Sequence, residues 1–230
     1  MHSTAIPDEI LARTRARRLG RSFLDRLDPA TTALLVIDLQ DGFLREGALL
    51  EVPLAREIVP VVNRLAADLR AAGGHVAFSR FAYLPDEPHP WTVFYDRFLN
   101  AEIAQEQKDA FAPGAADLQL WSALEVAGGD FVFDKSRYSA FTPGTSPLPG
   151  WLERRGIRTV IVVGTLSNCC CESTARDALQ HGYDVIFVED ANATLSDAEH
   201  TAALVNMLTL FADVVPAQAV CDRLSGRAAA

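Results

Sequence analysis

Three side-chain types that can do nucleophilic chemistry stand at or just beyond the ends of three apolar segments. They are an aspartate, a lysine and a cysteine triplet, at Asp38, Lys135 and Cys169-Cys170-Cys171. Each apolar segment is predicted to be a buried strand, because its apolar residues are consecutive rather than alternating. In open α/β sheets, ligands bind just outside the carboxyl ends of the strands. The spacing therefore places an acid, a cation and a thiol at one edge of a predicted sheet.

The cysteine triplet follows a sharp turn at Gly164 and begins a helix-compatible segment. The first backbone N–H groups of a helix are unpaired and carry partial positive charge, which stabilises a thiolate and makes it nucleophilic. The triplet is equally compatible with small buried hydrophobic side chains that pack a helix against a sheet. The residue types alone leave both interpretations open.

Asp38 and Lys135 also have structural alternatives. An aspartate at the end of a strand is often a helix cap or turn residue, but the following segment 40–43 already supplies turn chemistry, which favours a functional Asp38. Lys135 is compatible with a side chain that extends to solvent at the sheet edge. Two strands that end in opposite charges nevertheless favour a common site.

The hydrophobic pattern predicts alternating strands and helices. Strands are expected at residues 33–40, 75–79, 130–135, 157–163, 184–188 and 213–215. Helices are expected at 54–69, 149–155, 197–211 and 217–224, and after the cysteines. These alternations predict an α/β fold, a three-layer α-β-α sandwich around a central six-stranded, mostly parallel, Rossmann-like sheet. Residues 1–30 are expected to form an N-terminal helical arm that starts near Pro7, and residues 31–230 a single domain.

Residues 80–129 are long, broken by prolines and rich in aromatic side chains. Such segments in compact domains usually cover substrate or another surface, so a lid and a subunit interface are both open. The aromatic side chains either line a pocket or form a satellite hydrophobic cluster. They are Phe81, Tyr83, Trp91, Phe94, Tyr95 and Phe98.

Composition narrows the class of protein. The formal net charge of −9 disfavours nucleic acid and anionic membranes as partners, because both are bound by basic patches. We expect no transmembrane helix and no secretory signal, because no long apolar run is present and the first residues lack an apolar centre. Four cysteines, three of them adjacent, do not resemble a disulfide framework and indicate a reducing cytoplasm.

The sequence resembles the isochorismatase-like cysteine hydrolases, a superfamily that includes N-carbamoylsarcosine amidase, ureidoacrylate amidohydrolase, nicotinamidase and isochorismatase. The resemblance covers nearly all of the chain after residue 30 and is carried by three separate blocks in the order of the family. The blocks are VIDLQDGF at 36–43, KSRYSAF at 135–141 and GTLSNCCCEST at 164–174. Three blocks that match together are far more specific than any one motif.

The resemblance implies roles for individual residues. The catalytic aspartate, lysine and cysteine of the family fall on Asp38, Lys135 and Cys170. The family places its nucleophile three residues after a small hydroxyl residue, here Ser167, which selects Cys170 within the triplet. It also has a cis peptide bond, here between Thr165 and Leu166, and an oxyanion hole that would comprise the backbone N–H groups of Leu166 and Cys170. Phe43, Arg80, Tyr138 and Ser167 are the expected substrate-binding residues.

Departures from particular branches narrow the expected activity. Nicotinamidases carry an Asp-x-His…His metal site after the second strand, whereas residues 79–83 offer no such ligands, so we expect no metal and no cofactor. Isochorismatases usually lack the nucleophilic cysteine, so Cys170 indicates hydrolysis of a C–N bond. Segments 137–141 and 172–174 are most similar to the ureidoacrylate and N-carbamoyl amidase branch. The expected substrate is a small amide or ureido (N-carbamoyl) compound, and the expected assembly is a homo-oligomer, a dimer or tetramer.

Alternatives remain at this stage. One is an isochorismatase-type hydrolysis of an enol ether, and another is a non-catalytic member that binds a metabolite. A zinc site at the triplet is disfavoured because adjacent cysteines cannot converge on one tetrahedral ion. A serine hydrolase that uses Ser167 is disfavoured because segment 164–167 lacks the glycines of a nucleophile elbow.

Overall fold

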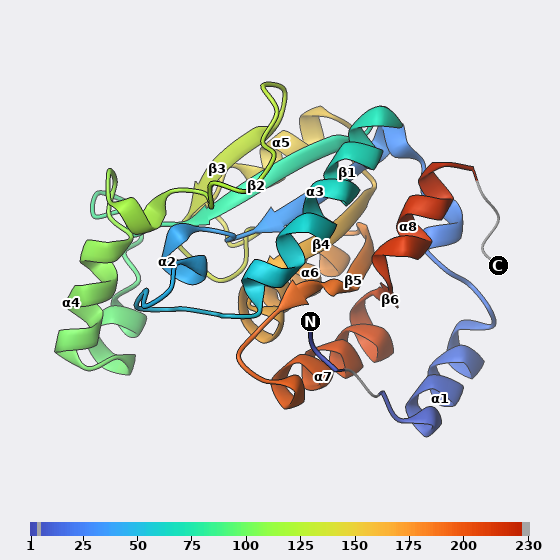
Figure 1. Ribbon diagram of the computed structural model, residues 1–230, viewed down its shortest axis with the longest axis horizontal. Helices are drawn as coiled ribbons and strands as arrows, with labels where there is room; N and C mark the ends of the chain where they lie inside the picture. The colour runs from blue at the N-terminus through green and yellow to red at the C-terminus, as the bar shows by residue number, and fades with distance from the viewer. Residues whose placement is uncertain (4–5, 227–230) are drawn as a thin grey trace.

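A parallel sheet forms the centre of the protein, as a computed structural model shows for residues 1–3 and 6–226 (Figure 1). Its strands are β1 (Thr32–Ile37), β2 (His75–Phe81), β3 (Phe131–Lys135), β4 (Thr159–Thr165), β5 (Asp184–Ala193) and β6 (Asp213–Val215). The strand order in the 6-stranded sheet is β3-β2-β1-β4-β5-β6, and every neighbouring pair is parallel. The predicted α/β fold with six strands is therefore confirmed.

Helices cover both faces of the sheet. One face packs against α3 (Ala55–Ala71) and α8 (Ala217–Leu224), together with the short α2 (Asp41–Leu44). The other face packs against α5 (Leu148–Arg154), α6 (Glu172–Gln180) and α7 (Asp197–Asn206). This arrangement makes the three layers visible in Figure 1. It also explains why β1 and β4 are apolar on consecutive residues, because both faces of these strands are buried.

The helix and strand ends differ from the predicted ones in several places. The first helix, α1 (Asp8–Arg18), is short because Leu19 and Gly20 both have positive φ angles, of 51° and 74°, which end the helix. Strand β5 extends beyond the predicted residue 188 to Ala193. Helix α7 ends at Asn206 and is followed directly by a π-helical turn, η6 (Met207–Phe211).

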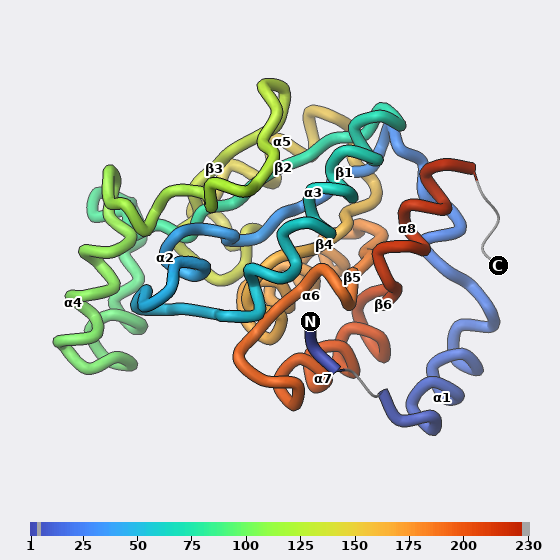
Figure 2. The backbone as a smooth tube through the Cα atoms, in the orientation of Figure 1, coloured from blue at the N-terminus to red at the C-terminus, as the bar shows by residue number. Residues whose placement is uncertain are grey.

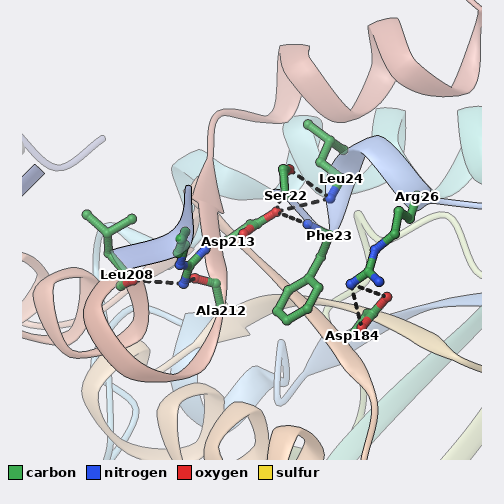
Figure 3. A network of polar contacts seen from close by, with 9 residues as sticks. Ser22, Phe23, Leu24, Arg26, Asp184, Leu208, Ala212 and Asp213 are labelled. Atoms are coloured by element: carbon green, nitrogen blue, oxygen red, sulfur yellow. Dashed lines mark hydrogen bonds and ion pairs between the residues drawn. The ribbon is translucent and has the colours of Figure 1, made fainter. Parts of the chain in front are cut away.

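The segment after α1 is held against the C-terminal part of the same chain. Asp213, at the start of β6, forms an ion pair with Arg18 and accepts hydrogen bonds from Ser22 Oγ at 2.7 Å and from the backbone N–H of Phe23 at 2.6 Å (Figure 3). Arg18 also donates to the carbonyl oxygens of Leu208 and Ala212. The 3-10 turns η1 (Leu24–Arg26) and η2 (Pro29–Thr31) then lead into β1. Polar contacts thus hold the end of α1 and the segment after it against residues 208–213.

The segment between β2 and β3 forms a separate lobe. It contains the π-helix η3 (Val93–Phe98), helix α4 (Ala101–Ala110) and the 3-10 turn η4 (Ala116–Leu118). Figure 2 shows α4 and α1 at opposite ends of the molecule. The lobe contacts the end of β1 through an antiparallel bridge between Gln40 and Leu120. This contact places the lobe over the edge of the sheet where the predicted catalytic residues lie.

None of the helices in residues 1–3 and 6–226 has both the length and the apolar character that a bilayer span requires.

Candidate active site

The carboxyl ends of the central strands bring Asp38, Lys135 and the cysteines to one edge of the sheet. Asp38 directly follows β1, Lys135 ends β3, and the π-helical turn η5 (Ser167–Cys171) begins just after β4. Strand β2 lies between β1 and β3, but the long lysine side chain crosses it. Lys135 Nζ lies 2.7 Å from Asp38 Oδ2, and neither side chain has any exposed area. The pair is therefore an ion pair that is fully shielded from solvent.

Ser79 on β2 fixes the orientation of Asp38. Asp38 has a φ angle of 50°, in the left-handed region that few residues other than glycine adopt, although aspartate tolerates it better than most. The Ser79 hydroxyl donates to Asp38 Oδ1 at 2.7 Å and accepts from the Asp38 backbone N–H at 3.2 Å. These two contacts hold both the main chain and the carboxylate of Asp38.

Lys135 stays charged although it is buried. Burial alone would lower the pKa of Lys135, but the charge of Asp38 and its hydrogen bond with Lys135 raise this pKa, and a Cys170 thiolate would raise it further. The ammonium also donates to the carbonyl oxygen of Arg137 at 3.0 Å and lies 5.4 Å from the centre of the Phe81 ring. Lys135 thus supplies a fixed positive charge next to both an acid and a thiol.

The turn that carries the cysteines depends on a close approach between β1 and β4. Gly164 has a φ angle of 123°, and a Cβ atom there would lie 2.1 Å from the carbonyl oxygen of Ile37, so only glycine fits. The peptide bond between Thr165 and Leu166 is cis. The Leu166 carbonyl oxygen then accepts hydrogen bonds from the N–H groups of Cys169 at 3.1 Å and Cys171 at 3.2 Å.

The three cysteines occupy different environments. Cys170 is 3% exposed and lines a cavity of about 300 Å³, and the partly exposed Cys169 lines the same cavity. Cys171 has no exposed area and packs in the core between the sheet and its helices. The geometry removes Cys171 from consideration as the nucleophile, whereas Cys169 and Cys170 both face the cavity.

The two thiols influence each other's ionisation. A hydrogen bond with Cys169 raises the pKa of Cys170, burial raises it further, and Lys135 offsets only part of this increase. The same hydrogen bond lowers the pKa of Cys169. Cys170 is therefore held as a thiol in the free protein, so its proton must pass to a neighbouring base when it attacks a substrate.

The cavity is bounded by residues from α2, from the connection before α3, from η3 and α4, and from the β4–η5 turn. Its lining comprises Phe43, Leu49, Leu50, Glu51, Val52, Phe81, Phe94, Gln107, Tyr138, Leu166, Cys169, Cys170 and Leu195. The structure thus brings Phe43 and Tyr138 to the cavity, together with Cys170. A larger hollow of about 430 Å³ lies beside the arm, but its lining contains none of the predicted catalytic residues.

Two of the expected substrate-binding residues do not line the cavity. Arg80 pairs with Asp134, its register neighbour on β3, with Arg80 Nε 2.6 Å from Asp134 Oδ1 and Nη2 3.0 Å from Oδ2. Side chains alternate along a strand, so Arg80 lies on the face opposite Ser79 and Phe81. Ser167 has no exposed area, and its Oγ lies 2.7 Å from His200 Nδ1. Neither Arg80 nor Ser167 lines the cavity, so the geometry does not support a contact of either residue with substrate, and their assignment remains a prediction.

His200 on α7 supports the turn that carries the nucleophile. His200 Nε2 lies 3.0 Å from the carbonyl oxygen of Glu189, which can only accept, so Nε2 carries the proton and Nδ1 accepts from the Ser167 hydroxyl. Burial lowers the pKa of His200 to about 4, and His2, whose ring stacks on it at 4.3 Å, contributes to this decrease. A neutral His200 thus holds Ser167 from outside the cavity.

Some of the aromatic side chains between residues 81 and 98 line the cavity, and others form a hydrophobic cluster beside it. Phe81 and Phe94 line the cavity. Trp91 and Tyr95 form a separate cluster with Phe94, in which the Trp91 ring lies 4.9 Å from that of Tyr138. The cluster thus supports the cavity wall from behind.

Sequence reasoning missed Ser79, Gln107 and His200. Ser79 could have been found, because a serine in an apolar strand beside Asp38 is unusual. Gln107 and His200 reach the site from helices whose docking no local pattern specifies. Among residues 1–3 and 6–226, no group of His, Cys, Asp and Glu side chains is arranged to hold a metal ion.

Comparison with known proteins agrees with this architecture. The Isochorismatase domain family matches residues 32–219. The chain is 31% identical over 198 residues to the ureidoacrylate amidohydrolase RutB of Methylobacterium radiotolerans, which covers 80% of this chain and 76% of RutB. It is 32% identical over 199 residues to Nicotinamidase 3 of Arabidopsis thaliana, covering 84% and 86% of the two chains.

A solved structure shares the fold. The cysteine hydrolase from Pseudomonas syringae pv. phaseolicola 1448A superposes with a TM-score of 0.77 at 27% identity, over 87% of this chain and 95% of that one. The family match spans most of the sheet and its helices, from the first residue of β1 into α8. The chain therefore belongs to the isochorismatase family of hydrolases.

Proposed function

We propose that the protein is a cysteine-dependent amidohydrolase that cleaves the C–N bond of a small amide or ureido substrate through an acyl-thioenzyme intermediate. Cys170 is the nucleophile, Asp38 the general base and acid, and Lys135 the fixed positive charge. The proposal depends on one observation: the buried Asp38–Lys135 pair acts electrostatically on Cys170, and Cys170 lines a cavity. The similarity to the amidohydrolases named above supports C–N hydrolysis as the reaction type.

The first half of the reaction acylates the cysteine. Asp38 takes the proton of the Cys170 thiol as Sγ attacks the substrate carbonyl carbon, and a tetrahedral oxyanion forms. The backbone N–H groups of Leu166 and Cys170 are proposed to stabilise this oxyanion, and losing one such donor typically costs about 3 kcal/mol of barrier. Asp38 then returns its proton to the leaving nitrogen, the C–N bond breaks, and ammonia or an amine departs.

The second half regenerates the thiol. Water attacks the thioester while Asp38 accepts a proton from it, and a second tetrahedral intermediate forms. Collapse of this intermediate expels the Cys170 thiolate, which recovers the proton from Asp38. Throughout the cycle one negative charge resides on Asp38, on the sulfur or on the oxyanion, and Lys135 stabilises each of these arrangements.

The expected single-domain organisation, cytoplasmic location and homo-oligomeric state remain predictions. The four cysteines are free thiols in the structure, which suits a reducing compartment. Light scattering after size-exclusion chromatography would test the predicted dimer or tetramer.

The decisive experiment compares three single variants on a panel of primary amides and N-carbamoyl compounds, with ammonia release as the readout. We expect Cys170→Ala to abolish release, whereas Cys169→Ser and Cys171→Ser retain it. Electrospray mass spectrometry of the wild type during turnover should detect the acyl adduct on the Cys170 peptide. Full activity in Cys170→Ala, or cleavage of an enol ether with no ammonia from any amide, would contradict the proposal.

A further inference from the structure

The cavity is built for a substrate without charge. We propose that it takes an uncharged amide or urea with an apolar body, and that Gln107 accepts a hydrogen bond from an N–H group of that substrate. This inference rests on the proposed amidohydrolase function and deepens it, because that function alone does not fix the charge of the substrate.

The first observation is the character of the wall. Most of the side chains that line the cavity are aliphatic or aromatic, and among the described residues that line it none is a lysine, arginine or histidine. Among the described lining residues the carboxylate is that of Glu51, which already pairs with Arg56 at 2.8 Å and accepts a hydrogen bond from the Gly47 N–H at 2.9 Å. Burial raises the pKa of Tyr138, so this side chain is a neutral phenol. The wall therefore presents no free positive charge.

The second observation is that the lysine and arginine side chains of β2, of β3 and of the loop after β3 are already paired. Lys135 pairs with Asp38, and Arg80 pairs with Asp134. Arg137, next to Tyr138 in the chain, pairs with Glu87 at 2.9 Å and lies 5.1 Å from the centre of the Trp91 ring. A substrate carboxylate in this cavity would lose its hydration without gaining a cation, which is strongly unfavourable. An N-carbamoyl amino acid is therefore a poor match.

The third observation is an unpaired acceptor. Gln107 on α4 is 6% exposed and lines the cavity, and its Oε1 atom is buried without a hydrogen-bond partner among the described residues. Buried polar atoms in folded proteins nearly always have a partner, so an orphan in a binding cavity points to a partner supplied by the ligand. Oε1 can only accept. The N–H groups of an amide or urea are the donors that such a substrate brings.

A matched pair of compounds tests the charge preference. N-carbamoylvaline and isobutylurea differ only in that the first carries a carboxylate where the second carries hydrogen, and both release ammonia on hydrolysis of the ureido group. We expect kcat/KM of the wild type to be at least about tenfold higher for isobutylurea. Calorimetry with the Cys170→Ala variant should show tighter binding of isobutylurea by a similar factor. Equal or higher kcat/KM and affinity for N-carbamoylvaline would overturn the proposal, as would binding of neither compound.

The two proposals fail separately. If Cys170→Ala binds isobutylurea in preference to N-carbamoylvaline but the wild type hydrolyses no amide or urea, the amidohydrolase function is wrong and the charge preference stands. If ammonia is released from both compounds at the same rate, the function stands and the charge preference is wrong.

Gln107→Leu tests the acceptor. Replacing an unpaired buried amide by an apolar side chain should leave the melting temperature unchanged or higher, whereas a residue with a merely structural role would lower it. We expect kcat/KM for isobutylurea to fall about fivefold. In calorimetry, the double variant Cys170→Ala with Gln107→Leu should bind isobutylurea more weakly than Cys170→Ala alone, by a similar factor. Gln105→Leu, an identical change at an exposed position of the same helix, is the control and should change neither quantity. Unchanged affinity and kcat/KM in Gln107→Leu would overturn the assignment.

Discussion

The Lys135 ammonium and the Asp38 carboxylate lie 2.7 Å apart, and neither side chain has any exposed area. In such a setting each charge is tolerable only because the other is present, since an isolated charge would lose its hydration without compensation. The proposed reaction uses the same feature, because the carboxylate can exchange a proton with Cys170 while the ammonium stays charged. Stability and chemistry are therefore coupled at this pair.

Breaking the pair from one side should destabilise the protein severely. We expect Lys135→Met to lower the free energy of unfolding by about 3–5 kcal/mol, because it leaves the Asp38 carboxylate buried and unpaired. The double variant Asp38→Asn with Lys135→Met should recover most of this loss but remain inactive. Arg26→Met is the control, because the Arg26 side chain of the Arg26–Asp184 pair is largely exposed and the pair contributes about 1 kcal/mol or less. Urea denaturation measures all three, and a double variant no more stable than Lys135→Met would contradict the prediction.

Ser79→Ala should affect turnover more than binding. The Ser79 hydroxyl contacts both the carboxylate and the backbone N–H of Asp38 but does not line the cavity. We therefore expect kcat to fall about tenfold with little change in KM, and stability to fall by about 1–2 kcal/mol. Steady-state ammonia release and urea denaturation provide the measurements. Ser122→Ala, at an exposed serine, should behave as the wild type. An unchanged kcat in Ser79→Ala would show that Asp38 needs no such support.

The sheet was predictable because its strands are buried on both faces and therefore read as continuous apolar runs, as β1 and β4 do. Because both faces of these strands are buried, the sequence does not show toward which face of the sheet each side chain points. In β2, apolar residues surround Ser79 and Arg80, so the sequence does not indicate which of these two side chains faces Asp38. The structure shows that it is Ser79 and that Arg80 pairs with Asp134 instead. An alternating pattern would have removed the ambiguity.

The cavity wall was less predictable than the strand ends. The strand ends are fixed by parallel topology, so the position of Asp38 follows once β1 is identified. Gln107 comes from a helix inside the long connection between β2 and β3, and its place in the cavity depends on how the whole lobe docks. His200 reaches Ser167 from α7 in the same manner. Docking of this kind depends on tertiary packing that no local pattern records.

Cys169→Ala should make Cys170 more reactive toward iodoacetamide near neutral pH. The hydrogen bond with Cys169 is the largest influence that raises the pKa of Cys170, so its removal leaves burial opposed by Lys135 and lowers this pKa. Only the thiolate reacts, so the labelling rate at a fixed pH below the pKa rises as the pKa falls. Peptide mass spectrometry across pH measures the rate for Cys170 alone. Cys221→Ala should leave the rate unchanged, because Cys221 packs against α3 outside the cavity. A slower rate in Cys169→Ala would contradict the prediction.

His200 should make the protein sensitive to mild acid. Its pKa is about 4 in the folded protein against an ordinary value of 6.5, so between these two values the unfolded chain binds a proton that the folded chain does not. The free energy of unfolding should thus fall as pH decreases from about 6.5 to about 4, by up to about 3 kcal/mol from this residue, and not rise.

His200→Gln tests this dependence, because glutamine keeps hydrogen-bonding capacity toward Ser167 and Glu189 but does not titrate. We expect the variant to be less stable than the wild type at pH 7 and to lose less stability on acidification, so that the two curves converge near pH 4. Urea denaturation at a series of pH values measures this convergence. His89→Gln, the same change at an exposed position, should follow the wild-type curve. Parallel curves for His200→Gln and the wild type would show that protonation of His200 is not what lowers the free energy of unfolding in mild acid.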